Sequence, residues 1–410
     1  MIIKLAWRNL WRNRLRTGIM LSAMVFGLVG VVILMGFLSS MYANMIENAI
    51  AWQTSHLQVQ RTGYIDNPDI NDTLIAPQAL LQHLNQQAEV AASSGRYLAE
   101  GMVASARATR GVRINGVDAD SEAAVTPIAS HILQGQWLDA QGRHPVVVSS
   151  KTAQRLKLTL GSKVVLTFTD AHGEVSGAAF RVRGLYRTPS SAFDDNNLFV
   201  RIDDLQALAG GQGIHQIAIR LADKDYRNIA ALQALRDALQ QHTNPDNRIR
   251  DWQQIQPLLA SILAQSGTSN AIILAIYVIA MGFGIVNIML MSVFERTREF
   301  GVLMAVGMQK HKVFALIIAE SSLLGLCGGV IGIVVSMGVI ALLSYTGIAL
   351  GNLAEGLNAF GVDTLLYPQV TPAEYRFIFL TVVIASILAA LYPAWHILKQ
   401  RPVDAMAEKH

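Results

Sequence analysis

Apolar residues gather at two places in the chain, in one run near the N-terminus and in a block over the last third. Between Arg16 and Glu47 no charged residue occurs. About 20 consecutive apolar residues are enough for a helix to cross the hydrocarbon core of a bilayer. The first run is longer than the roughly 7 to 15 residues of a signal-peptide core, so we expect an uncleaved anchor. We therefore predict four membrane-spanning helices, over residues 17–41, 270–294, 313–345 and 375–398.

The chain between the first two predicted spans, residues 42–269, has the pattern of a water-soluble domain. Polar and apolar residues alternate over residues 55–60, and β-branched runs occupy residues 145–149 and 163–168. Such patterns indicate β-strands. Helical stretches are predicted at residues 77–91, 151–156 and 226–242. The predicted fold class is a membrane α-helical protein with four transmembrane helices and a large α+β periplasmic domain inserted between helices 1 and 2.

Composition agrees with a membrane protein, since 52% of the residues are hydrophobic and only 15% are charged, against roughly 25% charged in soluble domains. The formal net charge is +4. Because the basic residues lie beside the apolar runs rather than in one patch, no binding of nucleic acid is expected. The single cysteine, Cys327, excludes an intramolecular disulfide and is expected to be a small packing residue.

Lysine and arginine flank the predicted spans unevenly. They occur before the first span, between the second and third, and after the fourth: Lys4, Arg8, Arg12, Arg14, Arg16, Arg296, Arg298, Lys310, Lys312, Lys399 and Arg401. Cytoplasmic loops of membrane proteins are enriched in these residues. Residues 1–16, the connection 295–312 and the tail 399–410 are therefore expected in the cytoplasm, and residues 42–269 and the loop 346–374 in the periplasm.

Residues 1–16 have a pattern of their own. Basic residues recur every four positions from Lys4 to Arg16, while Ile3, Trp7, Leu10 and Trp11 form an apolar stripe. This pattern predicts an amphipathic helix on the inner leaflet. The alternative is a basic flank that only sets the topology.

We find no catalytic or metal-binding motif in the sequence. The ten histidines include no His-Glu-x-x-His motif, and no Gly-x-Ser-x-Gly elbow occurs. Asp194 and Asp195 are better explained as a polar turn before a strand than as metal ligands. The stretch 160–163 resembles part of a phosphate loop, but position 156 is Leu rather than Gly. Any ATP hydrolysis is therefore expected in a partner chain, and this chain is expected to be non-catalytic.

The connection at residues 294–308, FERTREFGVLMAVGM, resembles the signature between the second and third spans of FtsX-like permeases. This ABC transporter family includes MacB and the lipoprotein-releasing permeases LolC and LolE. The similarity extends to residues 7–17, to the third span, and to residues 391–395 and 401–406. The segment 55–64 is most similar to the LolC and LolE type. The resemblance implies a multi-pass protein of the bacterial inner (cytoplasmic) membrane.

The resemblance implies that residues 295–312 contain a coupling helix that binds a cytoplasmic ABC ATPase dimer. Charged groups there suit contact with a soluble partner, and apolar side chains, including Val302 and Val306, supply further contacts. The candidate coupling residues are Glu295, Arg296, Arg298, Glu299, Phe300, Gly301, Met304, Ala305 and Gly307. ATP and Mg are expected on the ATPase, with no cofactor bound by this chain. The alternative is an ordinary cytoplasmic loop.

Glu320 lies about two turns into the third predicted span, where an ionised carboxylate is costly. One interpretation is a polar contact within the protein, with Arg14 or Arg16 as the partner. The other is a boundary residue that reaches the lipid headgroups.

The third span also carries glycines at a spacing of four, which favours close packing of helices within or between subunits. These are Gly325, Gly328, Gly329 and Gly332. The alternative is the general frequency of glycine in membrane helices.

Four spans are few for a substrate tunnel, so a mechanical role is predicted, in which ATP hydrolysis drives periplasmic work by mechanotransmission. The resemblance implies a second permease chain, either identical or a paralogue. The expected cargo is a lipoprotein bound for the outer membrane, with a periplasmic lipoprotein carrier as a further candidate partner beside membrane lipids. The alternatives are MacB-like efflux of a drug, peptide or toxin, and FtsX-like regulation of a periplasmic hydrolase.

Overall fold

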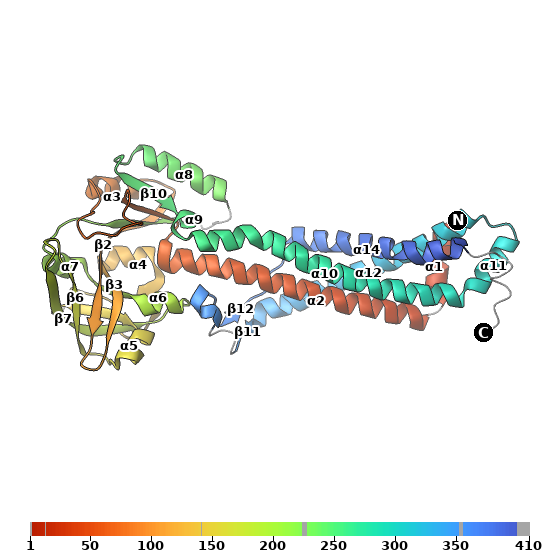
Figure 1. Ribbon diagram of the computed structural model, residues 1–410, viewed down its shortest axis with the longest axis horizontal. Coiled ribbons are helices and arrows are strands. Elements are labelled where there is room, and N and C mark those ends of the chain that lie inside the picture. Colours follow the sequence, from red (N-terminus) through yellow and green to blue (C-terminus); the bar gives the residue numbers. More distant parts are fainter. Residues whose placement is uncertain (1, 13, 141, 224–227, 352–355, 400–410) are drawn as a thin grey trace. The chain divides into compact units, whose positions relative to one another are not determined.

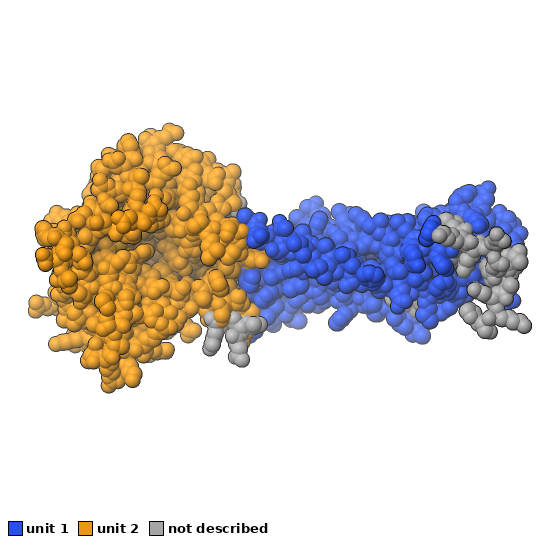
Figure 2. Space-filling view, viewed as in Figure 1, with its two compact units in different colours: residues 1–41, 264–349, 365–410 blue, residues 42–263, 350–364 orange. Residues whose placement is uncertain are grey.

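The computed structural model describes residues 2–12, 14–140, 142–223, 228–351 and 356–399, except the side chains at 16, 288 and 397–399. The chain forms two compact units (Figure 2). Unit 1 contains residues 1–41, 264–349 and 365–410, and unit 2 contains residues 42–263 and 350–364.

Long helices make up most of unit 1 (Figure 1). In the described part of the chain, four helices are long and apolar enough to cross a membrane, as predicted. They are α2 (Arg14–Asn48), α10 (Pro257–Glu295), α12 (Lys310–Thr346) and α14 (Pro372–Lys399). Two shorter helices, α1 (Ile2–Arg12) and α11 (Thr297–Ala305), and a small hairpin of β11 (Ile348–Ala349) and β12 (Leu365–Leu366) complete the unit. Helices α2 and α10 continue past the predicted spans, and each has residues in both units.

The glycines of α12 lie on two faces that pack against different helices of the same chain. A Cβ atom at Gly325 or Gly329 would meet Ser386 or Phe379 of α14. On the other face, a Cβ atom at Gly332 would lie 3.1 Å from Cδ1 and 3.3 Å from Cβ of Leu28 in α2, and Gly328 lies in the same way beside Met24. Glycine therefore lets α12 approach α2 and α14 closely within one subunit.

Unit 2 is built on a ten-stranded sheet in the order β10-β1-β9-β2-β3-β8-β5-β7-β4, with β6 beside β2 and β7. Its strands are β1 (Leu57–Arg61), β2 (Val90–Ala104), β3 (Thr109–Val117), β4 (Ile132–Gly135), β5 (Pro145–Ser149), β6 (Lys163–Thr169), β7 (Val175–Tyr186), β8 (Asn197–Arg201), β9 (Gln216–Leu221) and β10 (Asn247–Asp251). The β3–β8 and β5–β7 pairs are parallel, and the other pairs are antiparallel. The predicted α+β class is confirmed.

Short helices lie between the strands of this sheet or beside them in the chain. They are η1 (Ala49–Thr54), α3 (Pro77–Asn85), α4 (Ala119–Val125), η2 (Pro127–His131), α5 (Ser150–Leu156), α6 (Ser191–Asn196), α7 (Ile202–Ala209), α8 (Ile229–Gln241), α9 (Trp252–Ile255) and η3 (Asn358–Phe360). Alternate residues of the strands point to opposite faces. One face of β2, β3 and β8 enters an apolar core that includes Tyr97, Ile114 and Leu198.

The acidic pair at α6 makes structural contacts. The buried Asp194 carboxylate accepts hydrogen bonds from the backbone N–H and the hydroxyl of Thr188. Burial outweighs these bonds and raises the pKa of Asp194 to about 6. Asp195 forms an ion pair with Lys151 at 2.7 Å. Among the described residues, no group of three His, Cys, Asp or Glu side chains could hold a metal ion.

We predict that Gly332→Val weakens the contact of α12 with α2, because the added methyl groups overlap the Leu28 side chain. Overpacking of this kind costs about 1–3 kcal/mol. The free energy of unfolding in mixed micelles measures the loss. Gly338→Val is the matched control, since a Cβ atom at Gly338 has no neighbour within 4 Å. Equal losses in the two variants would contradict close packing at Gly332.

Candidate functional site

The connection between α10 and α12 is a short helix held between two turns. Helix α10 ends at Glu295, and α11 occupies Thr297–Ala305. Gly307 has a φ angle of +102°, which glycine adopts without strain, and it ends this short helix before α12 begins. We call residues 295–307 the coupling segment.

One side of α11 faces the interior of unit 1. Thr297, Phe300 and Gly301 are buried, and the Phe300 side chain is only 1% exposed. Leu303 and Met304 pack against the same apolar core. In this conformation Phe300 is buried and Met304 is partly buried, and their predicted contact with a partner stays a prediction. A helix that packs against a core buries one of its sides, and in α11 that side carries Phe300 and Met304.

The opposite side of α11 is exposed and mixed in character. Arg298, Val302 and Ala305 follow one another at helical spacing and are all exposed. Val302 is 50% exposed, and Val306, just after the helix, is 83% exposed. Glu295 and Gly307 are also exposed. Of the predicted coupling residues, this side carries Arg298 and Ala305.

Arg296 joins the coupling segment to α12. Its Nη1 atom lies 3.1 Å and 3.0 Å from the two carboxylate oxygens of Glu320, and its Nε atom donates to Glu299 at 3.1 Å. Its guanidinium also lies over the Phe300 ring, 5.1 Å from the centroid. Asn9 of α1 donates a second hydrogen bond to Glu320 at 2.6 Å. Arg296 therefore points inward and is not part of the exposed side.

Glu320 is a polar contact inside the protein. Of the partners expected from the sequence, Arg14 is exposed and makes no contact with Glu320, and the side chain at 16 lies outside the described residues. The observed partners come from α1 and from the coupling segment. Their position depends on how the helices pack, which the sequence did not indicate.

A second ion pair joins α1 to the coupling segment. Arg12 Nη2 donates to both carboxylate oxygens of Glu299, at 2.6 Å and 2.7 Å. The hydrogen bond from Arg12 lowers the pKa of Glu299, so the carboxylate stays charged. These side chains are 56% and 45% exposed, against 12% and 11% for Arg296 and Glu320. The buried pair is therefore the one whose disruption costs more.

The two ion pairs line one cavity of about 370 Å³ in unit 1. Its wall includes Asn9 and Arg12 of α1, Glu299 of α11, and Glu320 of α12. Three helices thus contribute charged or amide groups to a single polar cluster, which we call the ionic cluster: Asn9, Arg12, Arg296, Glu299 and Glu320.

Helix α1 is amphipathic, as the sequence pattern predicts, but its apolar residues divide between two surroundings. Ala6 is buried, and Leu10 packs against the core of unit 1. Ile3, Trp7 and Trp11 are exposed within the chain, as are Lys4 and Arg8. An exposed row of apolar residues suits the interfacial layer of a bilayer.

Two family models match the chain. The one described as "MacB-like periplasmic core domain" covers residues 17–240, and the one described as "FtsX-like permease C-terminal" covers residues 271–402. The chain belongs to the FtsX/MacB family of ABC transporter permeases. It is a permease component and a multi-pass protein of the inner membrane. The resemblance drawn from the coupling segment is confirmed.

The names of similar proteins refer to different transported substances. The macrolide export ATP-binding/permease protein MacB of Bordetella avium is 31% identical over 52% of this chain and 33% of that protein. The pyoverdine export ATP-binding/permease protein PvdT of Pseudomonas fluorescens is 25% identical over 87% and 54%. The lipoprotein-releasing system transmembrane protein LolC of Xylella fastidiosa is 24% identical over 72% of each chain. This FtsX/MacB-family chain spans about half the length, or less, of the first curated relatives it matches.

We predict that Arg12→Glu and Glu299→Arg each loosen α1, because like charges then meet where an ion pair lies. The double exchange should restore only part of the contact, because the arginine introduced by Glu299→Arg also lies beside Arg296. An exposed pair contributes about 0.2–1 kcal/mol, so amide hydrogen exchange in α1 should become about two to five times faster in each single variant. Arg8→Glu, at an exposed position of the same helix, is the control. Unchanged exchange in both single variants would contradict the role of this pair.

Proposed function

We propose that the exposed side of α11 docks on a cytoplasmic ABC ATPase dimer that binds ATP and Mg, and that this chain transmits the ATPase cycle as movement. The observation that carries the proposal is the ionic cluster. It ties α11 to α12 through Arg296 and Glu320 and to α1 through Arg12 and Glu299. A displacement of α11 therefore acts on two other helices instead of being absorbed by a free loop.

The chemistry of the spans supports transmission rather than conduction. Residues 17–46 of α2 and 257–294 of α10 contain no charged residue. Among the described buried residues of α12 and α14, the polar side chains are Ser321, Ser336, Ser386 and the paired Glu320. Substrate and ion pathways through membranes are usually marked by ionisable residues that face a water-filled cavity. Helices α2 and α10 instead contain long uncharged stretches, and each helix has residues in both units.

For the cargo, we propose a lipoprotein bound for the outer membrane, released to a periplasmic carrier by a complex with a second permease chain, identical or paralogous. Similarity to LolC over the same share of both chains supports this cargo. Export of a small molecule is the second candidate, because relatives described as macrolide and pyoverdine exporters match as well.

The test uses proteoliposomes that contain the permease, its ATPase and a fluorescent lipoprotein. On addition of ATP we expect release of the lipoprotein to a soluble carrier. Val302→Asp together with Val306→Asp places two carboxylates on the docking side and should reduce copurification of the ATPase and release of lipoprotein at least tenfold. Val302→Leu together with Val306→Leu keeps an apolar surface and is the matched control.

Different failures have different meanings. If the aspartate variant binds the ATPase and supports turnover as the wild type does, the docking side is wrong. If the wild-type complex hydrolyses ATP and exports a macrolide or pyoverdine but releases no lipoprotein, the cargo is wrong and the mechanical proposal stands.

A further inference from the structure

One face of the sheet in unit 2 is polar across five adjacent strands. Gln60 of β1 pairs with Gln216 of β9 across the two strands. Gln216 in turn pairs with Arg96 of β2. Cross-strand partners point to the same face. The residues of this face that also line the cleft are Gln58, Gln60, Gln216, Arg96, Arg113, Asn115, Asn197 and Phe199.

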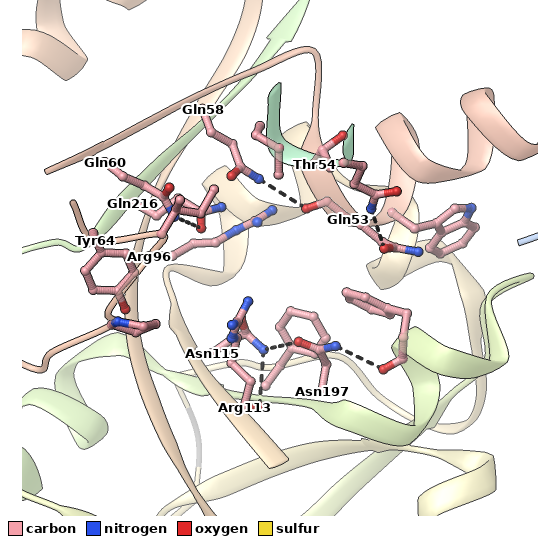
Figure 3. Close-up of a pocket in the computed structure, with 17 residues that line it drawn as sticks. Gln53, Thr54, Gln58, Gln60, Tyr64, Arg96, Arg113, Asn115, Asn197 and Gln216 are labelled. Carbon is pink, nitrogen blue, oxygen red and sulfur yellow. Dashed lines mark hydrogen bonds between the residues drawn. The ribbon is translucent and has the colours of Figure 1, made fainter. Parts of the chain in front are cut away.

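These side chains form the floor of a cleft of about 290 Å³ (Figure 3). The segment that faces the floor is η1, with Trp52, Gln53 and Thr54. The cleft is also lined by Phe193 of α6, by Tyr64, Ile65 and Pro68 after β1, and by Ile255 and Gln256 before α10. The roof therefore includes residues that directly follow α2 and residues that directly precede α10.

The floor amides are buried but only partly hydrogen-bonded. Gln58, Gln60 and Gln216 are 5%, 6% and 5% exposed. Gln60 Nε2 donates to Gln216 Oε1 at 3.2 Å, and Gln58 Nε2 donates to the Gln53 carbonyl at 3.3 Å. Among the described residues no partner meets Oε1 of Gln58, Oε1 of Gln60 or Nε2 of Gln216. Gln58, Gln60 and Gln216 line the cleft, so a ligand bound there could complete the hydrogen bonds of these polar atoms.

The charges of the cleft favour a ligand that accepts hydrogen bonds. Arg96 is matched by the buried Glu122, with contacts of 3.0 Å and 2.8 Å. Toward the residues that the structure describes, Arg113 donates through Nε to Glu100, and its side chain is 47% exposed. The lining contains no carboxylate. The terminal nitrogens of Arg113 are thus available to a carbonyl or a carboxylate.

We propose that this cleft binds a short peptide segment in extended conformation. Residues two apart on a strand are about 6.6–6.8 Å apart, and the main-chain groups of an extended peptide recur on one side at the same interval. Gln58 and Gln60 therefore match successive N–H and C=O groups of a peptide laid along β1. Each amide offers both a donor and an acceptor, as the peptide main chain does.

Aromatic rings supply the remaining contacts. Trp52, Phe193 and Phe199 line the cleft beside the amides and give apolar surface for the peptide's side chains. A bound peptide would contact both the floor and the roof. This inference holds whichever cargo the permease serves, because it concerns only what unit 2 binds.

The test measures calorimetric binding of acetyl-Ala-Ala-Asp-Ala-amide to the full-length permease in lipid nanodiscs, without ATPase. We expect saturable binding, weakened at least tenfold by Gln60→Met and by Gln216→Met, which keep side-chain length but remove the hydrogen bonds. Gln134→Met, at an exposed position on β4, should bind as the wild type does. A version of the peptide that carries a photoreactive group should crosslink the wild type at residues of the cleft, which keeps the test decisive if a variant does not fold.

Absence of peptide binding at millimolar concentration would overturn the inference, as would crosslinks outside the cleft. Binding of diacetylchitobiose in place of the peptide would also overturn it and make the cleft a glycan site. Because no ATP or cargo is present, these results are independent of the transport assay.

Discussion

The buried ion pair between Arg296 and Glu320 is the constraint on which the end of unit 1 that carries α1 and α11 depends. An ionised carboxylate in a membrane helix is costly unless a partner is close. Here the partner comes from the junction of α10 and α11, and Asn9 of α1 adds a second contact. Charge neutralisation in the interior therefore fixes where the coupling segment begins. The exposed side of α11 follows from this, because a helix anchored at Arg296 and at Phe300 can present only its opposite side.

Helix α12 connects this constraint to the rest of unit 1. Its first turns carry Glu320, and its glycines then let α2 and α14 pack closely along two faces. Close packing makes the helices move as a group rather than singly. The chain enters unit 2 through α2 and leaves it through α10. In the proposed mechanism these helices would receive the movement of α11, and the residues that follow α2 and precede α10 line the polar cleft.

Hydropathy and charge were enough to predict the four spans and the inserted α+β domain. A helix that crosses a bilayer needs a long apolar run, and such a run can be recognised without knowing any tertiary contact. The glycine spacing of α12 predicted close packing, and the structure identifies α2 and α14 as its partners. The side of α11 that faces inward could not be predicted, since nine residues with mixed polarity fit several rotations. The partners of Glu320 lie 24 and 311 residues away in the chain, and sequence gave no basis for choosing them.

The polar cleft shows the same limit. The alternation of Gln58 and Gln60 indicated a strand, but the amides and arginines beside them come from β9, β2 and β3, far apart in the sequence. Only the register of the sheet brings Gln216 next to Gln60 and Arg96 next to Gln216. A functional surface made by side chains from non-consecutive strands has no local signature.

A double-mutant cycle on Arg296→Met and Glu320→Gln, read as the free energy of unfolding in mixed micelles, tests the central claim most directly. Removing one partner of a buried pair costs about 3–5 kcal/mol. We expect each single change to cost this much and the double change to cost about 2–3 kcal/mol less than their sum. Additive losses would mean that Arg296 and Glu320 do not stabilise each other, and that the coupling segment is held in some other way.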